Sequence, residues 1–306
     1  MAEKLLIVGG TGFIGSNLAH KALENAFNTT VLSLNLPTKD KQIEGVEYLQ
    51  ADITNLDQLR ERLSSYKFDY IVNLAGYIDH SRFLDGGRQV INTHFDGVQN
   101  LLQVFDWTYL KRFVQIGSSD EYGDQMAPQS EDVRESPISP YSSGKLFSTQ
   151  LLQMLYRTEE LPIVVLRLFL VYGPDQNNKR FLPQIIGGCL SDSSFPASAG
   201  EQLRDFCYVD DISRGIIMSL KNDDVKGKVV NLASGKSISI REIVELVRSI
   251  IGYGNPQFGE IPYRVGENMA LYADTTKAKK LLNWTPEIEI EEGVRRTIFS
   301  QDSKSI

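Results

Sequence analysis

Residues 4–15 carry the sequence KLLIVGGTGFIG, an apolar run followed at once by glycines at positions 9, 12 and 15. The run predicts a buried β-strand, and the amphipathic pattern from Phe13 to Asn25 predicts a helix after it. Glycines let the backbone turn tightly, and the start of the helix offers free N–H groups and a positive dipole end to phosphate. The plainer alternative is an ordinary strand-to-helix turn, and the spacing G-x-x-G-x-x-G departs from G-x-G-x-x-G. The context favours dinucleotide binding by Gly9, Gly12, Phe13, Ile14 and Gly15.

The same alternation of strand and helix continues through the first half of the chain. Continuous apolar runs predict strands buried on both faces, and amphipathic stretches separate most of them. This order implies right-handed crossovers and a Rossmann-type α/β fold with a doubly wound parallel sheet. The expected strands are 4–8, 29–34, 46–49, 70–74, 112–116 and 163–169, and the expected helices are 13–25, 56–64, 90–107 and 142–158.

The pattern changes after Tyr172. Residues 173–206 carry Gly-Pro, Asn-Asn and Gly-Gly pairs, which predict turns and loops. We expect residues 1–172, with about 205–233 returning to the sheet, to form a dinucleotide-binding domain. Residues 173–204 and 234–306 are expected to form a smaller C-terminal substrate-binding lobe over the carboxyl edge of the sheet. The later elements are expected as helices at 211–220, 240–251 and 276–282 and a strand at 228–232.

Composition excludes several classes of protein. Cys189 and Cys207, the two cysteines, are too few for a disulfide framework and lack the CxxC spacing of a zinc site. Their scarcity suits a reducing compartment, and the first residues do not resemble a secretion signal. No run of 18 apolar residues predicts a membrane span, and the net charge of -7 argues against nucleic acid. We therefore expect a cytoplasmic protein without a metal site, membrane contact or nucleic-acid partner.

The end of the second expected strand bears on the choice between NAD and NADP. An acidic residue there commonly holds the ribose 2′-hydroxyl of NAD, whereas this chain has Ser33. Ser33, Asn35 and Lys39 could instead accept a 2′-phosphate, so NADP is favoured and NAD stays open. Asp52 and Ile53 end the third strand, where the carboxylate could accept the adenine amino group.

Tyr141 and Lys145 stand four residues apart on an expected helix and therefore share one face. A free phenol has a pKa of about 10, and a neighbouring ammonium favours the phenolate. Such a pair suits proton exchange between an alcohol and a carbonyl. A surface Tyr and Lys at this spacing is common, so the pattern gains its weight from the glycine loop earlier in the chain.

Together these features resemble the extended short-chain dehydrogenase/reductase family, in its branch of nucleotide-sugar epimerases, dehydratases and reductases. The likeness covers nearly the whole chain, and the order of its motifs is specific for the family rather than for the substrate. The matching segments are NLAG at 73–76, GSS at 117–119, YSSGK at 141–145, VYGP at 171–174, RDFCYVDD at 204–211 and ADTTKA at 273–278.

The resemblance implies roles for individual residues. Ser118 would hydrogen-bond the reacting sugar oxygen, Tyr141 would exchange its proton, and Lys145 would hold the ribose hydroxyls of the cofactor. Asn92 matches an asparagine that supports the site, and a homodimer is expected through the two long helices. By the same likeness, Leu74, Ala75 and Gly76 would line the cofactor, and Arg204 and Arg264 would grip a substrate diphosphate through bidentate donors.

The residues after Ser118 bear on the reaction. Dehydratases of the family carry Thr-Asp-Glu here, whereas this chain places Ser119 and Asp120 at the last two positions. The run GSSDEYG at 117–123 is closer to nucleotide 4-keto-6-deoxyhexose reductases, so we expect NADPH-dependent reduction of such a sugar with Tyr141 as proton donor. The alternatives are an NAD-dependent epimerase or 4,6-dehydratase and, outside enzymes, a catalytically silent dinucleotide sensor. Ser118, Ser119, Asp120 and His80 are expected to contact the substrate, and Leu170 replaces an asparagine common in the family.

Overall fold

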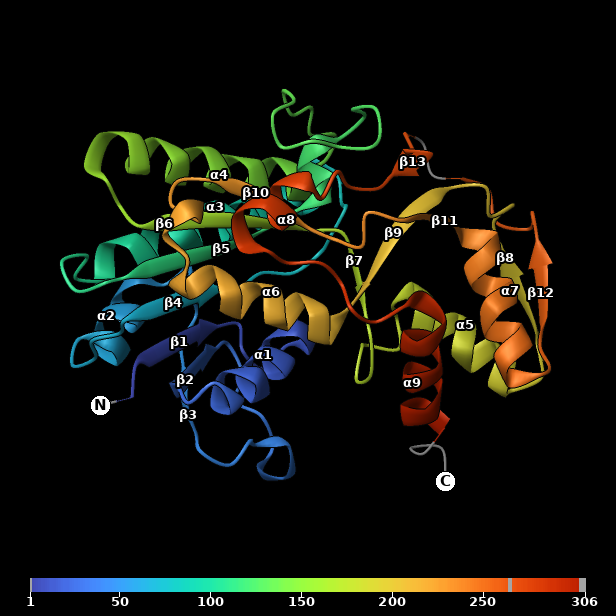
Figure 1. Ribbon diagram of the computed structural model, residues 1–306, viewed down its shortest axis with the longest axis horizontal. Helices are drawn as coiled ribbons and strands as arrows, with labels where there is room; N and C mark the ends of the chain where they lie inside the picture. The colour runs from blue at the N-terminus through green and yellow to red at the C-terminus, as the bar shows by residue number, and fades with distance from the viewer. Residues whose placement is uncertain (1, 264–265, 303–306) are drawn as a thin grey trace.

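The computed structural model describes residues 2–263 and 266–302. A seven-stranded parallel sheet forms its larger part, in the order β10-β6-β5-β4-β1-β2-β3 (Figure 1). The expected Rossmann-type fold is therefore confirmed. The strands of this sheet are β1 Lys4–Val8, β2 Asn28–Ser33, β3 Val46–Gln50, β4 Tyr70–Asn73, β5 Arg112–Ser118, β6 Ile163–Leu168 and β10 Val229–Leu232.

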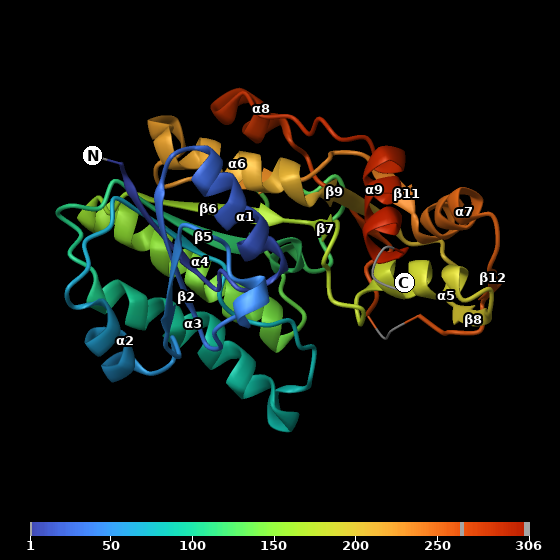
Figure 2. The ribbon, with the colours of Figure 1, turned by 90° about the horizontal axis from the view of Figure 1, so that it is seen from below.

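Helices cover both faces of the large sheet (Figure 2). Side chains alternate along each strand, so Leu5 and Ile7 of β1 enter one apolar cluster while Leu6 and Val8 enter the other. Because both faces are buried, every position of β1 after Lys4 is apolar, which is why its sequence is a continuous run. One face carries α1 Phe13–Glu24, α6 Val209–Lys221 and α8 Thr276–Leu282, and the other carries α2 Leu56–Leu63, α3 Gly87–Val104 and α4 Pro140–Glu159.

The strand order reverses between β1 and β4, and this reversal positions the site. Chain connections leave these two strands in opposite directions, so their carboxyl ends open a crevice. The Gly9 N–H donates to the Leu32 carbonyl at 2.7 Å, and the Leu74 N–H donates to the Val8 carbonyl at 2.8 Å. The glycine loop and the segment after β4 therefore lie side by side at this edge.

A smaller unit follows β6 and has its own apolar cluster. A single residue, Phe169, separates β6 from the first strand of this unit, and α6 begins directly after its strand β9. Helices pack around two small sheets at the far end of the molecule (Figure 1). One sheet contains β7 Leu170–Tyr172, β9 Leu203–Tyr208, β11 Ser237–Ser239 and β13 Ala270–Leu271, the other pairs β8 Ser194–Ala197 with β12 Asn255–Phe258, and the helices are α5 Phe181–Leu190, α7 Ile240–Ile251 and α9 Ile290–Asp302.

Residues 173–206 are more regular than the sequence predicted. They contain α5, β8 and much of β9, so the expectation of turns and loops is wrong over these elements. Gly187 and Gly188 lie inside α5, where a Cβ on Gly188 would come within 2.6 Å of the Phe195 ring. Gly188 therefore serves close packing instead of a turn. Likewise β9 joins the small sheet, and it is α6 and β10 that return to the large one.

Candidate active site

The glycine loop connects β1 to α1 at the carboxyl edge of the large sheet. Gly9 has a φ of +81°, and a Cβ there would lie 2.8 Å from the backbone nitrogen of Ala75. A Cβ on Gly15 would lie 2.5 Å from the Gly9 carbonyl oxygen, whereas at Gly12 the nearest atom is that oxygen at 3.4 Å. The first turn of α1, after Gly12, carries no acidic side chain. A tight loop below an open, positive helix end fits a pyrophosphate, and we propose that it holds one.

A pocket of about 420 Å³ opens beside the ends of β2 and β3. The Ser33 hydroxyl accepts a hydrogen bond from the Thr11 N–H at 3.2 Å, so it faces the glycine loop. Asn35 and Lys39 are exposed beyond it, and Asp52 accepts two local hydrogen bonds of 2.8 Å. We propose that this pocket takes the adenosine end of a dinucleotide. It is lined by Leu34, Gln50, Ala51, Asp52, Gln58, Glu61 and Arg62, of which Arg62 is a cation that the sequence did not single out.

The segment after β4 forms the opposite wall of the crevice. The Asn73 side chain accepts from the Ala75 N–H at 3.1 Å, which fixes the backbone as it leaves the strand. Leu74 and Ala75 are half-buried there. Ile53 is buried nearby, and a Cβ on Gly97 of α3 would lie 2.5 Å from its Cδ1 atom. The close approach of Gly9 to the Ala75 backbone places Leu74 and Ala75 beside the glycine loop, and their contact with the cofactor stays a prediction.

Ser118, Tyr141 and Lys145 converge at the carboxyl end of β5. Ser118 ends that strand, and Tyr141 and Lys145 lie one turn apart on α4, which packs beside it. The Ser118 side chain lies close enough to the Tyr141 phenol to lower its pKa, and Lys145 Nζ donates to the Ile116 carbonyl at 2.8 Å. Ser139 caps α4, so the helix begins one residue before Tyr141. All three side chains are buried, as proton transfer away from bulk water requires.

The electrostatics of the pair differ from the expectation. Burial raises the pKa of Tyr141, and the charge of Asp120 raises it further. Burial also lowers the pKa of Lys145 to about 8, against the opposing charge of Glu121. The prediction that Lys145 lowers the phenol pKa towards neutrality is therefore wrong for the protein alone, because desolvation outweighs attraction. In this state Tyr141 is a neutral phenol, ready to donate its proton.

His94 of α3 lies at the site, although the sequence did not predict a role for it. Its ring packs edge-on to Tyr141, with 5.1 Å between the ring centroids. Its Nε2 lies 2.9 Å from the Tyr77 carbonyl oxygen, which can only accept, so Nε2 carries the proton. A Cβ on Gly76 would overlap the imidazole, so this glycine leaves room for His94. No spacing in the sequence announces the contact, because it joins a loop and two helices.

Asn92 lies two residues before His94 on α3. It is half-buried, and within residues 2–263 and 266–302 no hydrogen bond joins it to Ser118, Tyr141 or Lys145. Positions two apart on an α-helix differ by about 200°, so Asn92 and His94 face different neighbours. The supporting role expected for Asn92 therefore stays a prediction, while His94 is the α3 side chain that packs against Tyr141.

Acid should destabilise the fold through His94. Burial, followed by the charge of Lys145, lowers the pKa of His94 to about 3 from 6.5. Between these values the unfolded chain binds a proton that the folded protein does not, so the free energy of unfolding falls as pH falls from 6.5 towards 3. We expect urea titrations to show a loss of about 2 kcal/mol between pH 7.5 and pH 5 from this group.

His94→Gln is the control for that result, because its amide can still donate to Tyr77. The variant should unfold with a flatter dependence on pH over the same window. An identical slope for both proteins would mean that His94 is not the group responsible.

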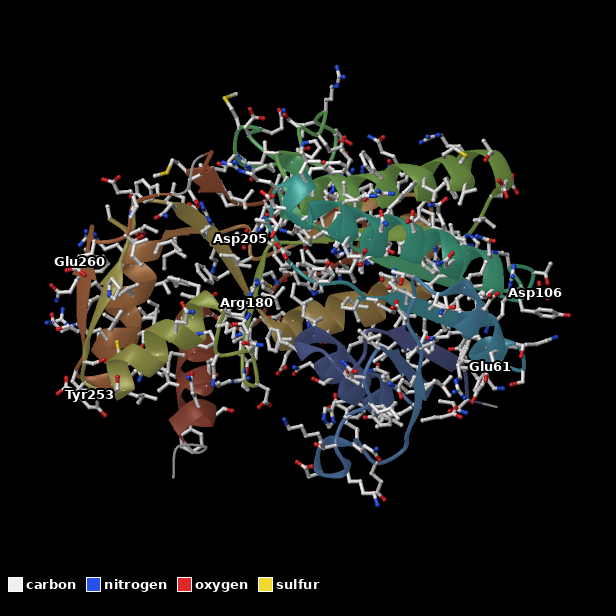
Figure 3. The ribbon with its side chains drawn as sticks, turned by 180° about the vertical axis from the view of Figure 1, so that it is seen from behind. Glu61, Asp106, Arg180, Asp205, Tyr253 and Glu260 are labelled. Atoms are coloured by element: carbon white, nitrogen blue, oxygen red, sulfur yellow. The ribbon has the colours of Figure 1, made fainter. Side chains whose placement is uncertain are left out.

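Asp120 lies in the short helix η3 (Ser119–Tyr122), immediately beyond Ser118. Burial raises the pKa of Asp120, and the charges of His80, Arg204 and Arg180 oppose this. The exposed His80 has its ring centroid 5.8 Å from that of Tyr141. Arg180, which precedes α5, lies at the junction of the two units (Figure 3). The structure thus gathers Asp120 and His80 near the phenol, and their expected contact with the substrate stays a prediction. It adds Arg180, which sequence reasoning missed.

Of the two arginines expected to hold a diphosphate, the structure describes one. Arg204 of β9 is paired with Glu267 and also donates to the Leu203 carbonyl at 2.8 Å. A diphosphate that binds Arg204 would compete with Glu267 for its guanidinium. Arg264 lies outside the described residues.

Two further properties concern residues 2–263 and 266–302 only. No helix in these ranges is long and apolar enough to cross a membrane. Nor do these ranges bring three His, Cys, Asp or Glu side chains together in a way that could hold a metal ion.

Comparison with known proteins assigns the family. Residues 5–233 match the model of the NAD dependent epimerase/dehydratase family, a match that spans the glycine loop, Ser118, Tyr141 and Lys145. The chain belongs to this family. The resemblance to the extended short-chain dehydrogenase/reductases, noted from the motifs, is thereby confirmed.

Relatives of this epimerase/dehydratase family member are similar over nearly their whole length. A UDP-glucuronate 4-epimerase of Thermodesulfobacterium geofontis is 32% identical, over 96% of this chain and 94% of its own. A Thermotoga maritima UDP-glucose 4-epimerase, solved with UDP-glucose, has a TM-score of 0.91 at 25% identity, covering 99% of this chain and 100% of its own. A Bacillus cereus UDP-glucuronic acid 4-epimerase, solved with UDP-glucuronic acid and NAD, has a TM-score of 0.86 at 27% identity, covering 98% and 99%.

Membership of the epimerase/dehydratase family fixes the general chemistry. The chain is an NAD(P)-dependent enzyme of the extended short-chain dehydrogenase/reductase type. The expected preference for NADP gains no support from the relatives. The expected 4-ketoreductase activity is less well supported than its epimerase or dehydratase alternative.

Proposed function

We propose that this protein is a nucleotide-sugar 4-epimerase that keeps its NAD bound through the reaction. The observation that carries the proposal is the buried Tyr141 phenol, which lies beside the buried Ser118 at the carboxyl edge of the sheet. A single phenol beside a hydroxyl suits repeated proton exchange with one sugar oxygen. The relatives described above are 4-epimerases of UDP-sugars, which supports the same chemistry and a UDP-linked hexose or hexuronate as the substrate.

The two structural units would divide the work. Residues 1–172, with α6 and β10, would bind the dinucleotide along the crevice between β1 and β4. Residues 173–204 and 234–306 would bind the nucleotide of the sugar, with Arg204 on its diphosphate. The sugar would then lie between Asp120 and Tyr141, where the units meet. A homodimer through α3 and α4 belongs to the same proposal.

In this proposal, residues of the chain transfer the proton of the C4 hydroxyl and hydrogen-bond its oxygen. Tyr141 would have to be the phenolate when it takes the proton of the C4 hydroxyl as the C4–H bond breaks, and as the neutral phenol it would return that proton when the alcohol forms again. Ser118 hydrogen-bonds the same oxygen, and Lys145 favours the phenolate through its charge while holding the ribose. NAD, when bound, supplies the acceptor and donor of the hydride at C4.

Purified protein without added cofactor provides the test. We expect released NAD on denaturation, and conversion of UDP-glucuronate or UDP-glucose to its C4 epimer, detected by chromatography of the sugar nucleotide. Turnover only of a nucleotide-linked 4-keto-6-deoxyhexose, and only with added NADPH, would establish the reductase instead.

One observation favours that second candidate. The end of β2 presents the neutral Ser33 and Asn35, followed by Lys39, so no carboxylate there repels a 2′-phosphate. NADPH is the reduced cofactor that a 4-ketoreductase would consume. The residues at the end of β2 therefore support NADP-dependent reduction, while Tyr141 and Ser118 would serve either reaction.

Ser33→Asp should move cofactor preference towards NAD. The new carboxylate would accept the ribose 2′-hydroxyl and repel a 2′-phosphate. We expect the ratio of dissociation constants for NADP and NAD to rise by about 10-fold or more, measured by calorimetric titration. An unchanged ratio would show that Ser33 does not face the 2′ position.

A further inference from the structure

The buried carboxylate of Glu121 lies directly behind the reacting side chains. Glu121 belongs to η3, and both it and its partner Arg167 have fully buried side chains, 0% exposed. Glu121 Oε1 accepts from the Ser118 N–H at 2.8 Å. Its Oε2 accepts from the Thr149 hydroxyl at 2.8 Å and from Arg167 Nε at 3.0 Å. One carboxylate therefore ties together the end of β5, the helix α4 and the strand β6.

These contacts reach both parts of the proposed machinery. Ser118 is held through its backbone, which sets where its hydroxyl points. Thr149 is on the same helix as Tyr141 and Lys145, one turn beyond Lys145. A Cβ on Gly117 would lie 2.6 Å from Glu121 Oε1, so the strand must carry glycine there to admit the carboxylate.

The charges around Lys145 indicate a second role for Glu121. Lys145 is only 5% exposed, and among the described residues no carboxylate forms a salt bridge with it. The charged or titratable groups around it are His94 on α3, Tyr141 on its own helix and Glu121 on η3. Of these, Glu121 is the anion, and its charge opposes the burial that lowers the pKa of Lys145.

The surroundings of Glu121 itself include both signs of charge. Arg167 faces it from β6 and also binds Glu135 at 2.6 Å, while Asp120 precedes it on η3. A buried ion pair by itself is weak support for a functional role, because such pairs also occur for structure alone. What sets Glu121 apart from Glu135 is its bond to Ser118 and its influence on Lys145.

We propose that Glu121 is a positioning residue of the active site: its carboxylate fixes Ser118 at the sheet edge, holds the helix of Lys145 through Thr149, and supplies a negative charge to this buried cluster. This inference rests on the proposed function, since it assigns Ser118 and Lys145 their roles in that reaction.

Glu121→Gln tests the charge, because the amide keeps the shape and still accepts from Ser118. We expect kcat/KM at pH 7 to fall about 10²-fold, and the alkaline limb of its pH profile to move down by about one unit as Lys145 loses its proton more readily. Glu135→Gln is the matched control: it removes the other carboxylate on Arg167 but touches neither Ser118 nor Thr149. Its alkaline limb should stay where it is in the wild type.

Glu121→Asp separates the effect of the negative charge from the effect of the bond to Ser118. It is also the second variant to measure if Glu121→Gln does not fold, because the amide N–H₂ of Gln would face the N–H donors of Arg167. The shorter side chain keeps the charge but withdraws the carboxylate from the Ser118 N–H. We expect kcat to fall about 10-fold with the alkaline limb unmoved. Thermal unfolding of each variant establishes which of them are folded.

Cofactor binding keeps the test independent of the sugar. Because Lys145 is proposed to hold the ribose, NAD affinity should weaken at a lower pH in Glu121→Gln than in the wild type, even where no sugar nucleotide is turned over. A wild type that epimerises no substrate would defeat the proposed function alone. Equal pH dependence of NAD affinity for wild type, Glu121→Gln and Glu135→Gln would overturn the role of Glu121.

Discussion

Tyr141→Phe should lose about 10³-fold in kcat while binding NAD with unchanged affinity. The substitution removes the phenol oxygen, which would exchange the proton at C4, and keeps the ring that packs against His94 and His80. Ser118 still accepts a hydrogen bond from the Asp120 N–H at 3.2 Å, so its hydroxyl is not left without a partner. Steady-state rates of epimer formation and a calorimetric NAD titration measure the two effects.

Tyr172→Phe is the matched control for this prediction. Tyr172 is buried in the smaller unit, and its hydroxyl donates to the Ile290 carbonyl at 3.4 Å. The same chemical change there should cost at most about 1 kcal/mol of stability and leave kcat unchanged. Retention of most activity by Tyr141→Phe would remove Tyr141 from the proton step.

Gly12→Ala should weaken cofactor binding, whereas Gly15→Ala should weaken the fold. At Gly12 a methyl group has room within the protein, since its nearest atom is the Gly9 oxygen at 3.4 Å. The methyl would project towards the proposed pyrophosphate, so we expect about 10²-fold weaker NAD binding with a fold of nearly normal stability. At Gly15 the methyl would lie 2.5 Å from the Gly9 oxygen, which should cost about 1–3 kcal/mol of unfolding free energy or more.

Urea unfolding and NAD titration of both variants distinguish these outcomes. The stability of the variants is measured without cofactor, so that weaker binding does not enter the result. If Gly12→Ala bound NAD as tightly as the wild type, the pyrophosphate would not lie over Gly12.

The large sheet could be predicted because its signal is local. Residues such as Ile7 and Val8 face opposite sides of β1, both buried, and this produces an apolar run visible in the sequence. The smaller unit lacks that signal. β9 pairs with β7, β11 and β13 from distant parts of the chain, and Gly188 inside α5 is explained only by its packing against Phe195 of β8.

The candidate site divides in the same way. Tyr141 and Lys145 are one helical turn apart, so spacing alone could pair them. His94 and Arg180 reach the site through tertiary contacts, which no residue spacing predicts. The bond of Glu121 to the Ser118 N–H is instead a local capping box, whose S-x-x-E spacing is visible in the sequence. The pKa of Tyr141 also depends on burial, which the sequence does not give, and this reversed the expected direction.

Two of the chain connections between the units are very short. β6 passes into β7 through Phe169 alone, and β9 passes into α6 with no residue between them. Because β7 and β9 are themselves paired, these two connections lie close together. The chain also crosses between the units at residues 233–236, 272–275 and 283–289, and the Asp205 carboxylate of β9 accepts from the N–H groups of Ser234, Gly235 and Ala273 on two of these crossings. These crossings, held together by one buried carboxylate, leave little freedom for the two units to rotate against each other, so a sugar nucleotide would meet a site whose geometry is already set.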